Sequence, residues 1–335
     1  QPINVDFRLV RPAEFASALH HFTGSKEHNV AMRQLAKKRG EKISEYGIEQ
    51  KNGEILTVES EEAFFNHFHL HYIPPELREG GEETERFKEV VELVSLKDIK
   101  GDLHMHSTWS DGAHTIEEMA EAARDRGYAY IAITDHSRYL KVANGLTPER
   151  IKLQREEIQR LNETYSDFTI LSGTEMDILP DGSLDYDDEL LKGCDFVIAS
   201  IHSAFSQHKD KIMQRLLAAL RNVHVDLIAH PTGRLIGRRP GYDVDLDILI
   251  DVAKETKTAL ELNSNPNRLD LSPVWLEKAQ KKGVPIIINT DAHHRHMLSQ
   301  MEIGVKTARK GWIKKETVLN TRTLDELRRF LKRHD

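Results

Sequence analysis

The stretch GDLHMHSTWSDG, residues 101–112, decides how the fold is interpreted. It begins as a short buried strand and then places His104 and His106 two residues apart, with Asp111 following shortly after. Side chains two residues apart on a strand point to the same side, so both imidazole rings can reach one metal ion from one face. The other ligands of such an ion must come from later parts of the chain.

Six further runs of apolar, often β-branched residues follow, with segments of helical periodicity between them. They are YIAIT (130–134), TILSGTE (169–175), FVIASIH (196–202), LIAH (227–230), ALELNSN (259–265) and IIINTDA (286–292). Capping motifs mark predicted helices at Thr115 with Glu118 and Gly127, at Ser272–Pro273 with Gly283, and at Thr323 with Glu326 before DELRRFLKR. Strands that alternate with helices about every 30 residues predict βαβ units and a parallel sheet.

Each of the seven predicted strands ends in polar side chains that could bind or orient a metal ion. In chain order these are His104, His106 and Asp111; Asp135 and His136; Glu175; His202; His230; Asn263 and Asn265; Asp291 and His293. The carboxyl ends of all strands meet at one mouth in a closed βα barrel, whereas a doubly wound sheet collects functional groups at a single crevice. The sequence therefore predicts an α/β fold, an irregular seven-stranded TIM-like (β/α) barrel.

The predicted ligand set contains histidine and carboxylate without thiolate, which suits Zn, Mn or Fe(II) at a hydrolytic centre. Any one of these histidines could instead be a hydrogen-bonded core residue, but six histidines and three carboxylates at strand ends favour a cluster of two or three ions bridged by Glu175. Two ions about 3.5–4 Å apart activate water and stabilise an in-line displacement at phosphorus. We therefore predict metal-assisted phosphoester hydrolysis.

Basic side chains near the predicted mouth could hold the phosphate. The loop HPTGRLIGRRPGY, residues 230–242, offers Arg234, Arg238 and Arg239, whose guanidinium groups suit bidentate contacts to phosphate oxygens. Lys141, just after Asp135 and His136, is a weaker candidate for the same role. Arginines on such loops are also common as purely structural residues.

Two other motifs are assigned to structure and not to metal. HFHLHY, residues 67–72, is interpreted as an edge strand that exposes His67, His69 and His71 on one face. DVDLD, residues 243–247, is interpreted as the cap and first turn of a helix. Cys194 lies in an apolar stretch, where we expect a buried and unreactive thiol.

The composition argues against a uniformly basic nucleic-acid coat, because 47 Lys and Arg face 54 Asp and Glu for a net charge of −7. No apolar run is long enough for a membrane span, and we expect a cytoplasmic protein. In residues 1–73 we predict one strand (5–10), helices near 12–20 and 27–39 and a strand-rich stretch. Residues 74–97 are predicted to be a linker and residues 98–335 the barrel, with the boundary between the two domains near residue 95. The start at Gln1 suggests a piece of a longer chain.

The strand-end series HMHSTWSDG, ITDHS, GTEMDI, SIHS, IAHPTGR and NTDAH resembles the polymerase-and-histidinol-phosphatase (PHP) domain, over about residues 98–335. VDFRLV followed by HHFTGSKEHN, and the junction IPPELRE, resemble the end of the palm and the thumb of a bacterial family X DNA polymerase. This resemblance implies a DNA partner with 3′ ends, gaps or abasic sites, and 3′→5′ exonuclease, end-processing and abasic-site cleavage activity in base excision repair near the nucleoid, with manganese or zinc.

The resemblance also assigns roles to residues. It implies that His104, His106, Glu175 and Asp291 hold one ion and carry catalysis, that Glu175, His202 and His230 hold a second ion, and that Asp111, His136 and His293 hold a third. It makes Asp6 the last of three polymerase carboxylates, and Phe22, Thr23, Gly24 and Asn29 a nucleotide-contacting thumb segment. The other two carboxylates would precede Gln1, so we do not expect this chain to polymerise by itself.

Two alternatives to the nuclease remain open at this point. One is a small-molecule phosphomonoesterase like the histidinol phosphatases, for which thumb-like residues 1–73 would have no use. The other is a catalytically silent metal domain that braces the polymerase. The native metal, the preferred DNA structure and the oligomeric state also stay open.

Overall fold

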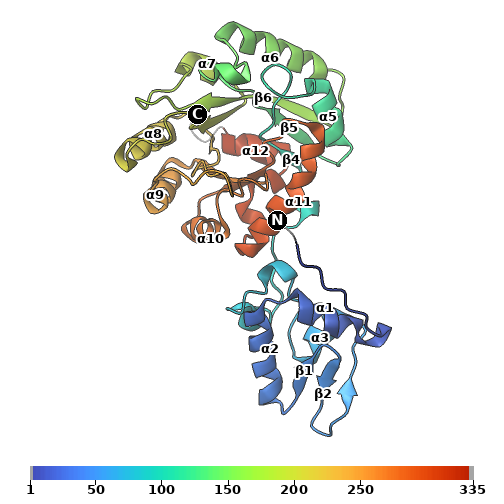
Figure 1. Cartoon of the computed structure of the whole chain (residues 1–335). Helices are drawn as coiled ribbons and strands as arrows, with labels where there is room; N and C mark the ends of the chain where they lie inside the picture. The colour runs from blue at the N-terminus through green and yellow to red at the C-terminus, as the bar shows by residue number, and fades with distance from the viewer. Residues whose placement is uncertain (1–2, 332–335) are drawn as a thin grey trace. The chain divides into compact units, whose positions relative to one another are not determined.

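The computed structural model describes residues 3–331, which form two compact units that divide between Glu92 and Leu93 (Figure 1). Residues 332 and 333 of the last predicted helix lie outside the described residues. Among the helices of the described residues, none is long and apolar enough to cross a membrane.

The first unit combines helices with a small antiparallel sheet of order β1-β2-β3. Its elements are η1 (Pro12–Glu14), α1 (Phe15–Thr23), α2 (Lys26–Lys38), β1 (Lys42–Ser44), β2 (Gly47–Glu49), β3 (Ile55–Leu56), α3 (Glu61–His67), η2 (Pro75–Leu77) and α4 (Glu83–Arg86). The helices predicted near 12–20 and 27–39 are confirmed as η1 with α1 and as α2. Ser25 caps α2, because its side chain accepts a hydrogen bond from the backbone N–H of His28.

Two predicted strands of this unit are wrong. The apolar alternation of residues 5–10 does not form a strand, because no described segment pairs with it, and the side chains of Phe7 and Leu9 are exposed. HFHLHY is not an edge strand either, since α3 ends at His67 and turns follow. The Nε2 atom of His67 lies 3.1 Å from a carboxylate oxygen of Glu41 instead.

The segment expected as a linker, residues 74–97, is partly packed within the first unit. The Arg78 side chain is fully buried; it donates to the carbonyl of Ile73 and to the Glu61 carboxylate, at 2.9 and 2.6 Å. Glu83 is also buried and lies 2.9 Å from Nδ1 of His28. Charged residues typical of a solvated linker are thus buried here as pairs, which composition alone does not reveal.

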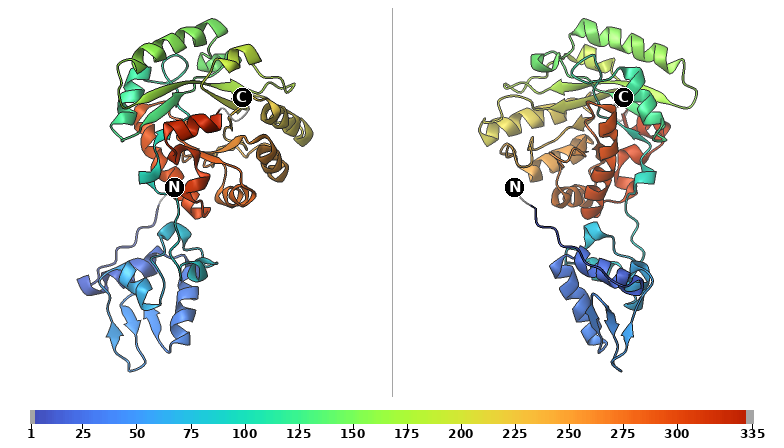
Figure 2. Two further views of the ribbon diagram at one scale, coloured as in Figure 1. Left: turned by 180° about the vertical axis from the view of Figure 1, so that it is seen from behind. Right: turned by 45° about the vertical axis from the view of Figure 1, so that its right-hand side comes forward.

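The second unit is a nearly closed barrel of seven parallel strands in the order β10-β9-β8-β7-β6-β5-β4. A bridge between Met105 and Ala292 brings the two edge strands together, and the N–H of His106 donates to the Ala292 carbonyl at 2.9 Å. Figures 1 and 2 show helices arranged around the outside of the strands. The predicted seven-stranded (β/α) barrel is confirmed.

The elements of the second unit begin with η3 (Leu96–Asp98), β4 (Gly101–Asp102), α5 (Ile116–Arg124), β5 (Tyr130–Ile133), η4 (Lys141–Ala143), α6 (Pro148–Asn162), β6 (Thr169–Asp177), α7 (Asp188–Lys192), β7 (Phe196–Ser200) and α8 (Lys209–Arg221). They continue with β8 (Leu227–Ile228), α9 (Leu246–Thr256), β9 (Ala259–Asn263), α10 (Pro273–Lys282), β10 (Ile286–Asn289), η5 (Arg295–Gln300), α11 (Met301–Lys310), η6 (Lys315–Thr317), η7 (Leu319–Thr321) and α12 (Leu324–Leu331).

Alternation along the strands separates two cores. On β5, Tyr130 and Ala132 belong to an inner cluster that Leu327 of α12 also joins. Ile131 and Ile133 belong to the larger cluster that includes buried residues of the surrounding helices. Successive strand residues therefore face the inside and the outside of the barrel in turn.

The predicted helix caps agree with the structure except at Gly127, because α5 already ends at Arg124. Thr115 caps α5, and its side chain accepts from the N–H of Glu118 at 3.2 Å. Gly283 ends α10 with φ of +82°, a conformation that favours glycine. Asp245 of the DVDLD motif caps α9 by accepting from the N–H of Ile248.

Candidate metal centre

Strand alternation places two carboxylates inside one end of the barrel. On β6, Leu171 belongs to the inner cluster, so Glu175, four residues further on, points to the same side. On β9 the same relation holds between Ala259 and Glu261. Both carboxylates are buried, with 1% and 0% of the residue exposed. The inner core is thus apolar near the strand starts and acidic near the strand ends.

The histidine pair of the opening stretch meets Glu175 and Asp291. Nε2 of His104 lies 3.4 Å from Oε2 of Glu175 and 3.5 Å from Oδ1 of Asp291. Nε2 of His106 lies 3.5 and 3.3 Å from the same two oxygens. These four atoms come from three different strand ends, and each of the two oxygens lies close to both imidazole nitrogens.

The other oxygen of Glu175 faces a second pair of histidines. Its Oε1 atom lies 3.2 Å from Nε2 of His202 and 2.9 Å from Nε2 of His230. Glu175 therefore stands between two sets of imidazoles, with one oxygen toward each. This is the geometry expected of a carboxylate that bridges two ions.

A third group gathers around Asp111. Oδ1 of Asp111 lies 3.6 Å from Nε2 of His136 and 3.4 Å from Nε2 of His293. The other nitrogen of His136, Nδ1, lies 3.0 Å from Oε2 of Glu175, so this ring stands between two groups. Among residues 3–331, three sets have ligand atoms close enough to hold an ion: His106, Asp111, His136 and His293; His104, His106 and Asp291; His136, Glu175 and His202.

The donor set fits divalent metal ions. Nε2 of His104, Nε2 of His106 and Oε2 of Glu175 are buried without a hydrogen-bond partner. Buried polar atoms without partners are costly and rare in proteins, so a group of them that converges on one point calls for a ligand. Imidazole nitrogen and carboxylate oxygen are the ligands of Zn, Mn and Fe(II).

The backbone is strained at two of these positions. His230 and Asp291 adopt positive φ angles of 30° and 54°, which non-glycine residues rarely do. Such strain is typical of functional sites, where the surrounding structure holds a side chain in place at an energetic cost.

The electrostatics of the cluster hold Glu175 ionised but differ among its histidines. Burial alone would raise the pKa of Glu175, but His202, His104 and His136 outweigh it and hold the pKa well below its ordinary value. Burial, with His293 and His136 adding to it, lowers the pKa of His106 to about 3. An ionised carboxylate and a neutral imidazole are the forms that coordinate a metal ion.

Against the lowering effect of burial, Glu175 and Asp177 raise the pKa of His202 to about 10. Asp111 and Asp291 likewise raise the pKa of His293 to about 9 against burial. A bound ion would therefore have to displace protons from these two rings.

Two further carboxylates, which the sequence interpretation missed, support the histidines from behind. Oε1 of Glu261 lies 2.7 Å from Nδ1 of His104, and Oδ1 of Asp177 lies 3.2 Å from Nδ1 of His202. An ionised carboxylate only accepts hydrogen bonds, so each ring donates from Nδ1 and turns Nε2 toward the centre. The available signal for Glu261 was an acidic residue within the apolar run ALEL. For Asp177 it was the position two residues after Glu175, on the same side of β6.

The predicted phosphate-binding arginines are largely engaged in holding their own loop. Nε of Arg234 donates to the carbonyl of Arg268 at 2.8 Å. The guanidinium group of Arg239 lies 3.9 Å from the ring centre of Phe205, and only Arg238 is exposed. Their role as phosphate ligands stays a prediction.

A different cation reaches the cluster. Nε of Arg268, which follows β9, lies 3.4 Å from Oδ2 of Asp291, and its side chain is 17% exposed. The sequence interpretation missed this residue because it follows a strand end by several positions in an irregular loop. Lys141 lies at the start of η4 and is exposed.

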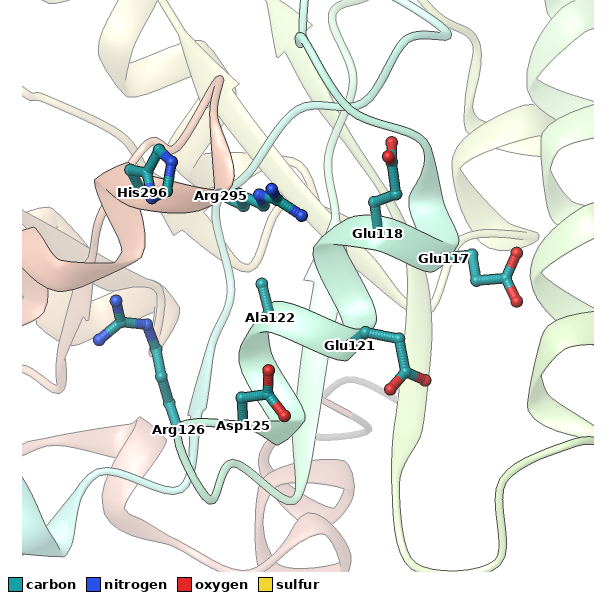
Figure 3. A pocket seen from close by; sticks show the side chains of 8 residues that line it. All are labelled: Glu117, Glu118, Glu121, Ala122, Asp125, Arg126, Arg295 and His296. Atoms are coloured by element: carbon teal, nitrogen blue, oxygen red, sulfur yellow. The ribbon is translucent and has the colours of Figure 1, made fainter.

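Figure 3 shows a separate hollow between α5 and η5. Glu117, Glu118 and Glu121 line it from α5, and Arg295 and His296 line it from η5. None of the nine residues predicted as metal ligands lines this hollow. With Asp125 and Arg126, its lining has four carboxylates against two arginines.

The predicted thumb residues lie in the first unit. Phe22 and Thr23 end α1, and Gly24 follows with φ of +73°. Nδ2 of Asn29 donates to the carbonyl of His21 at 2.8 Å, while Asp6 lies exposed in the extended N-terminal segment. Their contacts with a nucleotide stay predictions.

Comparison with protein families defines the class of each unit. The model of the PHP domain matches residues 102–265, and that of the DNA polymerase beta thumb matches residues 18–79. The second unit therefore contains a PHP domain, a class of metal-dependent domains, and the first contains a polymerase thumb.

The chain is 60% identical over 333 residues to the DNA polymerase/3′-5′ exonuclease PolX of Bacillus subtilis (strain 168), a match that covers 99% of this chain and 58% of that relative. It therefore belongs to the bacterial family X DNA polymerases that carry a PHP domain. A probable phosphatase of Thermoanaerobacter sp. (strain X514) is 29% identical over 69% of this chain and 94% of that protein. The structure of histidinol phosphate phosphatase from Lactococcus lactis with zinc, L-histidinol and phosphate is 20% identical with a TM-score of 0.44, covering 61% of this chain and 92% of that one.

Proposed function

We propose that the second unit holds two or three divalent ions, Mn²⁺ or Zn²⁺ with Fe²⁺ as a further option, and hydrolyses phosphodiester bonds at the 3′ ends of DNA as a 3′→5′ exonuclease. The observation that carries this proposal is Glu175, whose two oxygens each face a different pair of histidines. When bound, the ions would supply an activated water and Lewis-acid stabilisation of the phosphate.

The side chains of this chain have separable roles in that proposal. His104, His106, Glu175 and Asp291 hold one ion, Glu175 with His202 and His230 holds a second, and Asp111 with His136 and His293 holds a third. Glu261 and Asp177 keep the proton of their histidines on Nδ1, so that Nε2 is free to bind an ion. Glu261 does so for His104 and Asp177 for His202. Arg268, beside Asp291, offers guanidinium N–H groups to a phosphate oxygen.

DNA is proposed as the substrate because a polymerase thumb shares the chain with this centre, and because the B. subtilis relative is named for both activities. The proposed range is 3′-end processing and abasic-site cleavage in DNA repair, with residues 98–335 as the catalytic domain. The same proposal places the protein in the cytoplasm, in association with the nucleoid.

Release of mononucleotides from a 3′-labelled oligonucleotide with Mn²⁺ tests this function. His106→Ala and Asp291→Ala should abolish release, while His208→Ala, which changes an exposed histidine at the start of α8, should leave it unchanged. An unchanged rate in the first two variants would refute the proposal.

Two competing outcomes are visible in the same assay. Much faster cleavage of histidinol phosphate than of a DNA end would favour the phosphomonoesterase. A full complement of ions without hydrolysis under any divalent metal would favour a silent structural domain.

A further inference from the structure

A loop beside the metal centre forms a groove that the proposed chemistry does not use. Residues 137–147 form the later part of the connection between β5 and α6. Among them and at the start of α6, Arg138, Tyr139, Lys141, Asn144 and Arg150 line the groove. We call it the rim groove. It lies within the second unit, on the side of the strand ends.

Hydrogen bonds hold the rim groove against the centre. The N–H of Ser137 donates to the carbonyl of Glu175 at 3.1 Å, and the N–H of Leu146 donates to the carbonyl of His136 at 2.8 Å. Both ends of the loop are therefore tied to residues of the metal cluster. Asn144 reaches the third group of the cluster, because its Nδ2 donates to the carbonyl of Ser110, next to Asp111, at 3.3 Å.

The lining of the rim groove is positive. Arg138 pairs with Asp185 at 3.1 Å, while Arg150 donates to the carbonyl of Asn144 at 2.8 Å, which leaves the charge of Arg150 in place. Lys141 is exposed and makes no ion pair with a described residue. Three cations thus face one carboxylate in the lining, a balance that attracts phosphate.

The same loop exposes a flat aromatic side chain. Tyr139 is 42% exposed, and the neighbouring Val142 is 94% exposed. Aromatic rings next to cations are the usual platform for unpaired nucleic-acid bases, because every base can stack on them while the cations contact the backbone. A paired base is already stacked inside its duplex and gains less from such a ring.

The chain geometry limits how far the platform lies from the centre. Tyr139 follows His136 by three residues, so their Cα atoms are at most about 11 Å apart. Successive nucleotides of a strand rise at least about 3.4 Å each. Tyr139 is therefore within reach of the first few nucleotides next to a 3′ end whose terminal phosphodiester lies at the metals.

We propose that the rim groove binds the unpaired nucleotides directly 5′ of the terminal one, with a base stacked on Tyr139 and a backbone phosphate beside Lys141. This inference rests on the proposed exonuclease function and assigns to it a nucleotide site outside the metal centre.

Two substrates of different length test the inference in the full chain. A 3′-labelled single-stranded oligonucleotide reaches the groove, whereas the p-nitrophenyl ester of thymidine 5′-monophosphate has only one nucleotide and reports the metal centre alone. Tyr139→Ala should raise the KM for the oligonucleotide about 5- to 150-fold, from the usual strength of base stacking. It should leave hydrolysis of the ester unchanged, and Tyr139→Phe should behave like the unaltered chain on both substrates.

Lys141→Gln tests the phosphate contact separately. It should raise the oligonucleotide KM and lower the salt dependence of binding by about 0.7 in the log–log slope, as expected for one lost contact to a single strand. Lys254→Gln is the matched control, because Lys254 is also exposed but lies near the end of α9 that precedes β9, at the opposite end of the barrel.

The outcomes separate this inference from the proposed function. Equal effects of Tyr139→Ala on both substrates, or no effect on either, would overturn the rim groove as a nucleotide site. Hydrolysis of neither substrate by the unaltered chain would overturn the exonuclease instead. In that case the affinity for a fluorescent single strand in Ca²⁺ still decides: weakening by Tyr139→Ala supports the groove, and unchanged affinity refutes it.

Discussion

Replacing Glu261 with glutamine should weaken metal binding although Glu261 is not proposed as a ligand. Its Oε1 atom accepts from Nδ1 of His104 at 2.7 Å and from Nδ2 of Asn289 at 3.1 Å. Its Oε2 atom accepts from the N–H of His230 at 2.7 Å and from Nδ2 of Asn263 at 3.3 Å. Donors therefore approach both oxygens, and an amide NH₂ group must face donors in either orientation.

The expected size of this effect follows from those contacts. A hydrogen bond to a buried charge contributes about 1.5–3 kcal/mol, and an unsatisfied buried donor costs about 1–3 kcal/mol. Losing the support behind a metal-binding histidine typically weakens metal affinity about 10- to 100-fold. Glu261→Gln should therefore raise the Mn²⁺ dissociation constant by that factor and lower the free energy of unfolding by about 1–3 kcal/mol.

Titration of free Mn²⁺ by electron paramagnetic resonance measures the change in affinity directly. Asp226→Asn is the control. Asp226 is also a buried carboxylate that accepts a hydrogen bond, from the N–H of Val197, but it directly precedes β8 and so lies at the other end of the barrel. The control should lose stability without losing Mn²⁺ affinity. Unchanged Mn²⁺ binding in Glu261→Gln would refute the idea that this carboxylate orients His104.

Three further predictions concern the metals and the first unit. Glu175→Gln should reduce the number of Mn²⁺ ions bound per chain and cut nuclease activity more than about 100-fold, as metal analysis and the oligonucleotide assay would show; an unchanged ion count would contradict the bridging role. Removing metals with a chelator should lower the melting temperature of the second unit. Its free energy of unfolding should fall by about 2.7 kcal/mol, compared with a metal concentration 100 times the dissociation constant. Tryptophan fluorescence reports this unit, because Trp109, Trp275 and Trp312 all lie in it; identical melts with and without chelator would argue against bound ions. Burial, with His28 and Arg78 adding to it, lowers the pKa of His20 to about 3 from 6.5. Below pH 6.5 the unfolded state therefore binds a proton that the folded state does not. The first unit should lose up to about 1.4 kcal/mol of stability per pH unit as the pH falls from about 6.5 toward 3. Hydrogen exchange of α1 and α2, corrected for intrinsic rates, would show this loss, and an equal slope in His20→Phe would contradict its origin.

The barrel could be predicted because its pattern is local and repeated. Each strand is a short apolar run, each helix has its own cap, and the spacing between strands matches βαβ units. The polar residues that follow the strands then had to meet, since the carboxyl ends of parallel strands share one mouth. The structure brings Glu175 and the histidines of the first strand within 3.5 Å of each other.

What the sequence did not reveal depends on partners that are distant in the chain. Residues 5–10 have the alternation of a strand, but a strand forms only beside another strand, and alternation says nothing about a neighbour. Glu261 is separated from His104 by 157 positions, so only the closed barrel shows that they touch. Arg78 and Glu83 looked solvated because burial of a charge is decided by its partner and not by its residue type.

Anomalous X-ray scattering at the manganese edge, from crystals of the chain soaked in Mn²⁺, would locate the ions that Glu175 is proposed to bridge. We expect at least two peaks about 3.5–4 Å apart, one at each oxygen of Glu175. A single peak away from Glu175, or no peak within bonding distance of His104 and His106, would contradict this expectation.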